Sequence, residues 1–248
     1  MTDSSTETSD TQYQAAVDRT EERARLQAQV LRKKSMLIFG PEGVGKTRLL
    51  QSFIPTQPLA LYVGHMSSPR DLLLGLIQNL HRLEKRQLRL PTSPQSLRTS
   101  SLKGMVLRAL DELPFLLFLD HLSGPSRVVT GLIKEMNYYG RTPIYFAART
   151  PHMEDVGGLL PMCSDRSERL EVRNLPPSIA LRFAKREAEK SGLWSSNLES
   201  ALDSIVDWCD GNPGAILQML KMAQYDRYRL GDQIKAHILY LDFRMGRR

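Results

Sequence analysis

The stretch "SMLIFGPEGVGKTRLL", Ser35 to Leu50, joins a short apolar run to a glycine-rich loop. Its central octapeptide "GPEGVGKT", Gly40 to Thr47, matches the pattern G-x-x-x-x-G-K-[ST] at every fixed position. With average residue usage the four fixed positions recur by chance in roughly one chain in a hundred of this length, and a preceding strand and following helix make chance rarer. The stretch therefore predicts a phosphate-binding loop between a buried strand and a helix.

Each fixed residue of this loop has a chemical task. Gly40, Gly43 and Gly45 let the backbone turn tightly, so that successive N–H groups point at a β-phosphate. Lys46 supplies positive charge to the β- and γ-phosphates, the Thr47 hydroxyl is a Mg²⁺ ligand, and the following helix adds its positive dipole end. The predicted nucleotide-binding residues in this region are Gly40, Pro41, Glu42, Gly43, Val44, Gly45, Lys46, Thr47 and Arg48.

A second stretch, "PFLLFLDHLSG" (Pro114 to Gly124), ends an apolar run on Asp120, 74 residues after Lys46. In P-loop ATPases an aspartate in such a place holds the Mg²⁺, and an unpaired carboxylate at the end of a buried strand would be costly. We therefore predict Asp120 as a metal residue together with Thr47.

The position after Asp120 normally carries an acid that activates the attacking water, and here it is His121. Two interpretations remain open. A neutral imidazole could accept the proton itself or through a relay. Alternatively, His121 only packs or hydrogen-bonds, and the general base is absent or lies elsewhere. Because loss of a positioned base costs on the order of 10²–10⁴ in rate, we expect weak or partner-dependent hydrolysis.

The rest of the chain alternates apolar runs with helical patterns until Pro176. Continuous apolar runs separated by helices imply a parallel sheet that is covered on both faces. The predicted fold class is therefore α/β: a P-loop sheet with helices on both faces, followed by a small all-α lid domain. The predicted strands lie at 35–40, 59–64, 115–120, 143–148 and 169–175, and the predicted lid helices at 177–191, 198–208, 213–228 and 232–243.

The predicted domain division follows from these patterns. Residues 1–12, "MTDSSTETSDTQ", are too polar to fold and are expected to form a disordered tail. Residues 13–175 form the P-loop α/β domain, which begins with a charged helix from Tyr13 to Lys34. Residues 176–248 form the helical lid domain.

The bulk properties fit a cytoplasmic, non-membrane protein with an anionic partner. The net charge of +7 suits a nucleotide or a polynucleotide equally. From Arg70 to Arg108 there are eight Lys and Arg residues against two acids, which indicates either a solvated surface or a polyanion-binding one. Apolar runs fall far short of the roughly 20 residues that span a bilayer, and no secretory signal is visible. Two cysteines without metal-type spacing are typical of reduced thiols.

Four motifs together resemble the AAA+ and STAND group of P-loop ATPases, from about Gln29 to the C-terminus. They are "GPEGVGKT", "FLLFLDHL", "PIYFAART" and "GNPGAI", and their order and spacing carry most of the resemblance. The resemblance implies ATP with Mg²⁺ as cofactors, ATPase activity and a homo-oligomer. The lid motif has no second sensor arginine, so the chain is more similar to STAND-type, transposition-helper and origin-recognition-like members than to standard motors.

The resemblance also implies three further site residues. Arg149, at the end of the fourth strand, matches the polar sensor near the γ-phosphate, with Thr150 as a weaker candidate. Pro213 in "GNPGAI" matches the lid proline that approaches the nucleotide. Arg166, or less favourably Arg169, matches the arginine finger presented to a neighbouring subunit. The expected catalytic set is Lys46, Asp120, His121, Arg149 and Arg166.

Two functions remain open. The first is a nucleotide-gated oligomeric switch on double-stranded DNA, of the transposition or replication accessory type, because related ring-forming ATPases line their DNA channel with residues after the second strand. The second is a STAND-like signalling or scaffold ATPase, whose effector protein would be a separate chain bound by the helix Tyr13–Lys34. The candidate DNA contacts, all to phosphates, are Lys85, Arg86, Arg89, Arg98 and Lys103.

Overall fold

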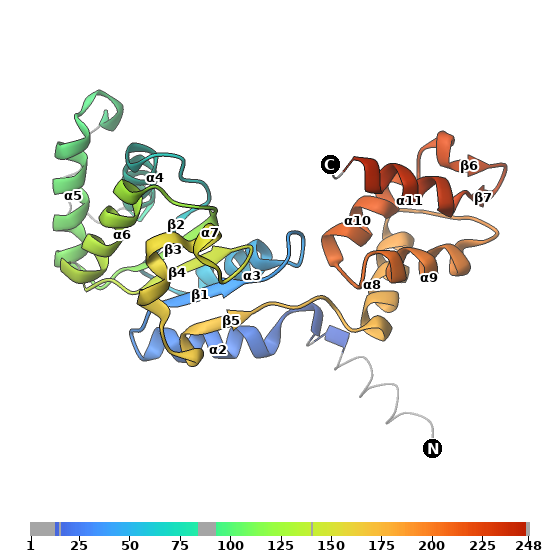
Figure 1. The fold of residues 1–248 in the computed structure, drawn as a ribbon, viewed down its shortest axis with the longest axis horizontal. Helices are drawn as coiled ribbons and strands as arrows, with labels where there is room; N and C mark the ends of the chain where they lie inside the picture. The colour runs from blue at the N-terminus through green and yellow to red at the C-terminus, as the bar shows by residue number, and fades with distance from the viewer. Residues whose placement is uncertain (1–12, 15, 84–92, 140, 247–248) are drawn as a thin grey trace, which may run out of the picture. The chain divides into compact units, whose positions relative to one another are not determined.

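The computed structural model describes residues 13–14, 16–83, 93–139 and 141–246 (Figure 1). Its contacts divide the chain into two compact units. The α/β unit comprises Glu22–Gly40 and Lys46–Val172. The helical unit comprises Arg173–Arg248, the loop Pro41–Gly45 and the N-terminal Met1–Glu21. The predicted disordered tail lies outside the described residues.

The α/β unit is built on five parallel strands in the order β2-β3-β4-β1-β5. Because parallel strands present their carboxyl ends at the same edge, the glycine loop after β1 and the aspartate of β3 belong to one edge of the sheet. The parallel sheet is as predicted, although its last strand ends at Glu171 rather than at 175. The strands are β1 (Met36–Phe39), β2 (Ala60–Val63), β3 (Leu116–Leu122), β4 (Ile144–Ala148) and β5 (Arg169–Glu171).

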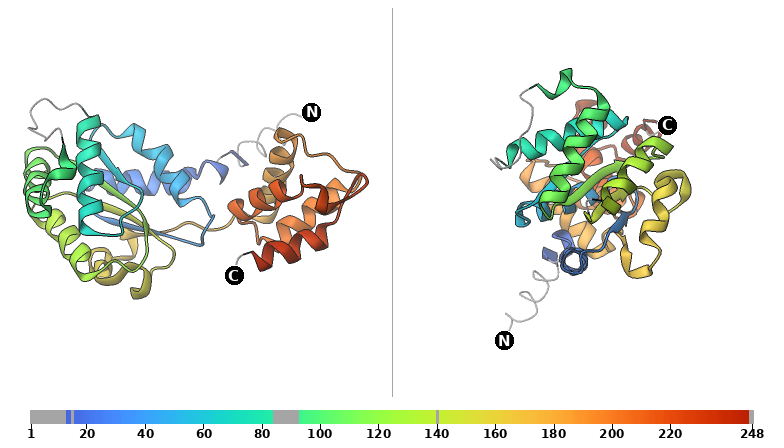
Figure 2. Two further views of the ribbon diagram at one scale, coloured as in Figure 1. Left: turned by 90° about the horizontal axis from the view of Figure 1, so that it is seen from above. Right: turned by 90° about the vertical axis from the view of Figure 1, so that its left-hand side faces the viewer.

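Helices cover both faces of this sheet, as predicted (Figure 2). Leu117 and Leu119 of β3 lie in a buried cluster with side chains from three helices on one face. Phe118, which alternates to the other face, packs its ring on Phe53 and stacks on Tyr145. The helices of the first face are α4 (Pro69–Arg82), α5 (Thr99–Glu112) and α6 (Arg127–Tyr139), Phe53 belongs to α3 (Lys46–Phe53), and α7 (Met153–Val156) follows β4.

The N-terminal helical region is not one continuous helix, so the prediction of a helix from Tyr13 to Lys34 is wrong in this respect. Helix α2 spans Thr20–Leu31, and the preceding Arg19 has a left-handed φ of 56°. A left-handed residue breaks the helical hydrogen-bond ladder. Further along, α2 lies beside β5 and the turn before it: the Arg25 side chain donates to the carbonyl of Arg169 at 2.9 Å, and the Gln29 side chain donates to the carbonyl of Ser167 at 2.7 Å.

In the helical unit, residues 173–246 form four α-helices around a core that includes Phe183, Ile205, Ile216 and Phe243. The prediction of helix from residue 232 is wrong, because the chain there forms an antiparallel hairpin whose tip has Gly231 at φ 60°. The helices are α8 (Pro177–Lys190), α9 (Leu198–Trp208), α10 (Pro213–Met222) and α11 (Ala236–Met245), and the hairpin strands are β6 (Arg229–Leu230) and β7 (Gln233–Ile234). Within the described part of the chain, every helix is too short or too polar to cross a membrane.

Candidate nucleotide-binding site

The glycine loop adopts the tight turns that its sequence predicts. Gly43 and Gly45 have φ angles of 78° and 105°, which residues with a side chain rarely adopt. At the end of β1, the N–H of Gly40 donates to the Arg149 carbonyl at 3.2 Å. The Lys46 ammonium donates to the Gly40 carbonyl at 2.7 Å. The α/β unit thus brings Lys46 and the backbone of Arg149, two predicted site residues, to the same end of the sheet.

Asp120 is buried and held on both carboxylate oxygens. Only 1% of its side chain is exposed. Oδ1 accepts the His121 backbone N–H at 2.8 Å, and Oδ2 accepts the Tyr62 hydroxyl at 3.0 Å. A buried carboxylate without hydrogen-bond partners would be strongly destabilising. These two donors therefore stabilise Asp120 and hold it in place.

The chain bulges where Asp120 is followed by His121. The register of β3 against β4 shifts between Leu119 and Leu122, and His121 has a left-handed φ of 52°. A bulge bends a strand and redirects its side chains. Here the Asp120 carboxylate stays buried while the His121 side chain, at the edge of the sheet, is 66% exposed.

Tyr62 is a site residue that the sequence analysis missed. It lies opposite Phe118 in the register of β2 with β3, two residues before Asp120. The Asn79 side chain of α4 bonds both the N–H and the carbonyl of Tyr62, at 3.2 and 2.8 Å. Burial, followed by the negative charge of Asp120, raises the pKa of Tyr62 to about 12, so its hydroxyl remains a donor. Only the strand register could have revealed this pair.

Three donor atoms gather at the predicted metal residues. The His121 Nε2 lies 3.5 Å from Thr47 Oγ1 and 3.8 Å from Asp120 Oδ2. A hydroxyl and a carboxylate are the oxygen donors that suit Mg²⁺, which usually keeps several waters and takes one or two protein ligands. Thr47 and Asp120 therefore fit the cation that the P-loop pattern implies.

The less favoured candidates for the sensor and the arginine finger, Thr150 and Arg169, both make hydrogen bonds to nearby residues. Thr150 donates its hydroxyl to Asp155 Oδ2 at 2.6 Å, and Arg169 donates from Nε to the Cys163 carbonyl at 2.7 Å. Both side chains are thus bonded to residues five or six positions away in the chain. The side chains of Arg149 and Arg166 are exposed, which suits the preferred choices for both roles.

In the helical unit, the start of α10 contacts the loop 41–45. Pro213 is the first residue of α10, as the motif predicts, but the bonds are made by its neighbours. The Gly214 N–H donates to the Gly43 carbonyl at 2.9 Å. The Asn212 side chain donates to the Glu42 carbonyl at 2.9 Å, and it also caps α10 by accepting the Ala215 N–H. Pro213 was predicted from the motif, whereas Asn212 and Gly214 were not.

This contact requires glycine on both sides. A Cβ on Gly214 would lie 2.7 Å from the Gly43 Cα, and a Cβ on Gly43 would lie 2.7 Å from Asn212 Oδ1. Nearby, the buried Arg19 donates to the Val44 carbonyl at 2.9 Å. Residues 42–44 are therefore bonded from α10 and from the N-terminal segment of the same unit.

The candidate DNA contacts are only partly described. Lys85, Arg86 and Arg89 lie outside the described residues. Arg98 is exposed directly before α5. Lys103 forms an ion pair of 2.6 Å with Glu135, so its charge is partly neutralised within the α/β unit.

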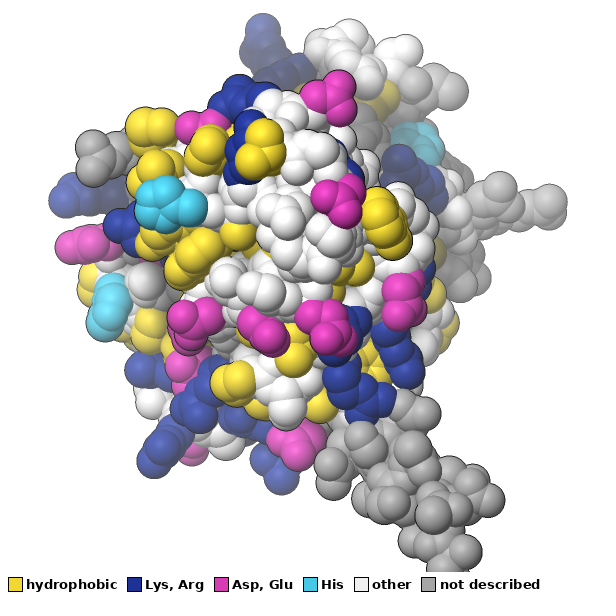
Figure 3. Space-filling view, turned by 90° about the vertical axis from the view of Figure 1, so that its right-hand side faces the viewer, with side chains coloured by type: hydrophobic (Ala, Val, Ile, Leu, Met, Phe, Trp, Pro, Cys, Tyr) yellow, Lys and Arg dark blue, Asp and Glu magenta, His cyan; other side chains and the backbone are white. Residues whose placement is uncertain are grey.

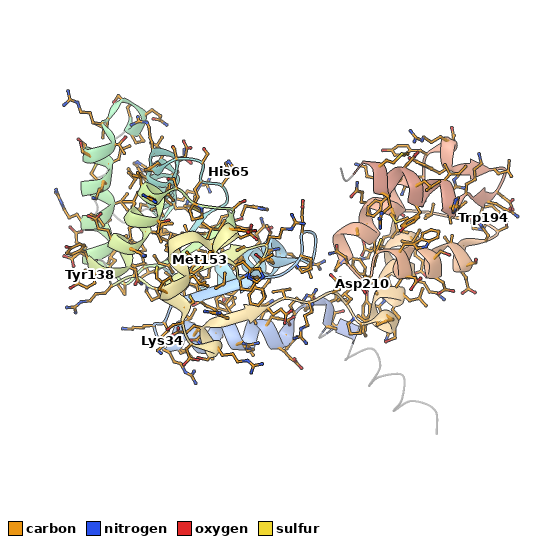
Figure 4. The ribbon with its side chains drawn as sticks, viewed as in Figure 1. Lys34, His65, Tyr138, Met153, Trp194 and Asp210 are labelled. Carbon is orange, nitrogen blue, oxygen red and sulfur yellow. The ribbon has the colours of Figure 1, made fainter. Side chains whose placement is uncertain are left out.

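A hollow of about 370 Å³ lies in the helical unit, and none of the predicted site residues lines it. Its walls include the apolar Leu181 and Val206 and the acidic Asp203, Asp207 and Asp210. Figure 4 labels Asp210, which accepts a hydrogen bond from Asn174 at 3.1 Å. In the space-filling view of Figure 3, acidic side chains form a band across the face turned to the viewer, with basic ones below. Three carboxylates make the hollow unsuitable for phosphate groups.

No protein-family model and no curated protein matches the chain. Solved structures do match. A Walker-type ATPase of Pyrococcus abyssi is 17% identical with a TM-score of 0.64, over 92% of this chain and 72% of that one. The Orc1 protein of Aeropyrum pernix, solved in complex with DNA, is 14% identical with a TM-score of 0.64, over 92% and 65%. Domain III of the Thermotoga maritima replication initiation protein DnaA is 15% identical with a TM-score of 0.54, over 91% and 92%.

These similarities define the class of fold. The chain has the fold of origin-recognition-like AAA+ P-loop ATPases, which confirms the resemblance inferred from its four motifs. At such identities the matches establish the architecture alone.

Proposed function

We propose that this chain binds ATP with Mg²⁺ at Gly40–Thr47 and hydrolyses it weakly or only with a partner, as a nucleotide-gated oligomeric switch on DNA. The observation that carries the proposal is the grouping of Lys46, Thr47 and Asp120 at one edge of the sheet, with a histidine in place of the acid. Lys46, Thr47 and Asp120 supply groups that bind the phosphates and the cation. His121 stands where hydrolysis usually requires a carboxylate.

The geometry supports the following roles. The Lys46 ammonium exchanges the Gly40 carbonyl for the β- and γ-phosphates. Thr47 and Asp120 would hold the Mg²⁺, which supplies neutralisation of phosphate charge when bound. The Tyr62 hydroxyl, from the neighbouring strand β2, donates to the Asp120 carboxylate and helps to hold it in place. His121 is exposed and offers a ring nitrogen instead of the carboxylate that would activate water, so intrinsic turnover should be slow.

The switch would act through two parts of the chain. Arg149 would sense the γ-phosphate, while the α10 segment with Asn212, Pro213 and Gly214 would respond to what the loop 41–45 holds, because it bonds to that loop. Arg166, exposed in a single 3₁₀ turn, would serve as a finger toward a neighbouring copy in a homo-oligomer. DNA would bind through the basic segment 70–108.

Fluorescence anisotropy with labelled double-stranded DNA tests this proposal, with ATP, with ADP and without nucleotide, over a salt series. We expect ATP-dependent binding that weakens steeply with salt. Arg98→Ala should reduce the slope of log affinity against log salt concentration by about 1, because one phosphate contact is lost. Lys185→Ala removes an equal charge from the helical unit, where Lys185 pairs with Glu199, and serves as the control. Absence of binding at low salt would refute the DNA part.

The second candidate, a STAND-like ATPase with a separate effector protein, is favoured by one observation. On α11 the side chains of Ile238, Leu241 and Met245 are 45%, 47% and 65% exposed. Their spacing places them on one face of the helix, which a partner protein could cover. Nucleotide binding without DNA binding in the anisotropy experiment would favour this function over the first.

A further inference from the structure

The His121 ring nitrogen faces the two cation-binding oxygens, and this suggests a role other than that of a base. Nε2 lies 3.5 Å from Thr47 Oγ1 and 3.8 Å from Asp120 Oδ2. Two donors bound at right angles to one cation, each at about 2.1 Å, lie about 3.0 Å apart. The distance from His121 Nε2 to each of the two oxygens is thus within about 1 Å of the spacing that a shared cation requires.

The backbone of His121 is held beside Asp120. His121 sits in the bulge at φ 52°, and its N–H is fixed by Asp120 Oδ1 at 2.8 Å. A left-handed conformation is unfavourable for a residue with a side chain, so it needs such support. The same bond that holds the Asp120 carboxylate therefore also fixes the backbone from which the His121 ring extends.

The chemistry of the donor set determines which cation it prefers. Hydroxyl, carboxylate and water suit Mg²⁺, whereas a neutral imidazole binds divalent transition-metal ions far better than it binds Mg²⁺. A set that contains one imidazole shifts the preference of the site toward ions such as Mn²⁺ or Co²⁺. A general base would have to face the attacking water, but this nitrogen faces the cation ligands.

We propose that His121 is a direct ligand of the nucleotide-bound divalent cation and raises the affinity of this site for transition-metal ions relative to its affinity for Mg²⁺. The inference rests on the proposed function, since the cation is bound together with the nucleotide. It assigns His121, the unusual residue after Asp120, a function in determining which metal ion the site prefers.

The experiment uses the full chain with a non-hydrolysable ATP analogue and Mn²⁺ as the probe. Protein labelled with ¹⁵N at histidine is examined by pulsed electron paramagnetic resonance, so that a ¹⁵N coupling to Mn²⁺ arises only from the protein and not from adenine. We expect a directly bonded ¹⁵N coupling in the wild type, and its loss in His121→Gln. His65→Gln, at an exposed histidine after β2 that Figure 4 labels, should retain the coupling.

A competition titration supplies the second readout. The ratio of Mn²⁺ to Mg²⁺ affinity in the presence of the analogue should fall about tenfold in His121→Gln and stay unchanged in His65→Gln. Nucleotide binding is measured separately in EDTA with a fluorescent analogue. Nucleotide binding with no ¹⁵N coupling, or with the same metal ratio in His121→Gln, would overturn this inference alone. Failure of the wild type to bind nucleotide under any condition would overturn the proposed function and this inference with it.

Discussion

At the scale of single residues, the pair Tyr62 and Asp120 shows how a neutral hydroxyl stabilises a buried carboxylate. The hydroxyl donates at 3.0 Å, and its pKa is raised to about 12 by burial and then by the charge of Asp120. A neutral donor adds no charge that would compete with a cation for the carboxylate. Asp120 can therefore be held in place and still serve as a metal residue.

Tyr62→Phe should lower the free energy of unfolding by about 1–3 kcal/mol at pH 8, because Asp120 Oδ2 loses a buried partner. The folded pKa is raised above the ordinary value of 10, so the contribution of the hydroxyl is complete below pH 10 and is lost as the pH rises to about 12. In Tyr62→Phe, the part of the fall in unfolding free energy between pH 10 and about 12 that comes from this hydroxyl should be absent. Urea unfolding at several pH values measures both effects.

The control for this prediction is Tyr138→Phe, at a tyrosine that is 77% exposed and is labelled in Figure 4. It should behave like the wild type at every pH. Equal stability of Tyr62→Phe and Tyr138→Phe across the pH range would show that the Tyr62 hydroxyl does not support Asp120.

His121→Glu should raise basal ATP turnover by about tenfold or more, because it restores a carboxylate where a base that activates water is expected. Steady-state phosphate release measures the rate, and His65→Glu is the control for added charge. If the wild type already turns over near one per second, a rate within the usual range of enzymes, and the substitution slows it, His121 is itself the catalytic group.

At the scale of elements, the contact between the start of α10 and the loop 41–45 depends on two glycines. The Gly214 N–H reaches the Gly43 carbonyl only because neither residue has a Cβ in the way. Asn212 adds its cap and its bond to Glu42 in the same turn. The "GNPG" sequence therefore serves this contact as well as starting a helix.

Gly214→Ala should lower the free energy of unfolding by about 1–3 kcal/mol, because the new methyl would lie 2.7 Å from the Gly43 Cα and the backbone would have to move. Gly104→Ala is the matched control. Gly104 is also in a helix, α5, but its Cβ would meet open space, so this change should raise stability by about 0.5–1 kcal/mol. Chemical denaturation compares them, and equal effects would contradict the account.

The elements also show what could be predicted from sequence. The strands and the glycine loop were predictable because buried parallel strands are continuous apolar runs and the loop has a fixed pattern. The Tyr62–Asp120 bond was not, since it depends on the register between β2 and β3, 58 residues apart in the chain. The β6–β7 hairpin was missed because its strands have only two residues each, too few for an alternating pattern.

At the scale of the whole molecule, the net charge of +7 is not evenly distributed. The basic segment 70–108 belongs to the α/β unit, whereas the hollow of the helical unit has three carboxylates. If DNA is the partner, the charge pattern assigns it to the α/β unit, and single charge removals in the helical unit should leave the salt dependence unchanged. The proposed comparison of Arg98→Ala with Lys185→Ala tests this distribution directly.

The central claim is that Gly40–Thr47 binds ATP, and equilibrium titration with a fluorescent ATP analogue and Mg²⁺ tests it most directly. Lys46→Ala removes the ammonium that meets the phosphates, and should weaken binding by at least about tenfold, which corresponds to 1.4 kcal/mol. Lys34→Ala, at an exposed lysine paired with Glu168 and labelled in Figure 4, should bind like the wild type. Saturable binding that is lost only in Lys46→Ala is the predicted result, and unchanged affinity in Lys46→Ala would contradict the account.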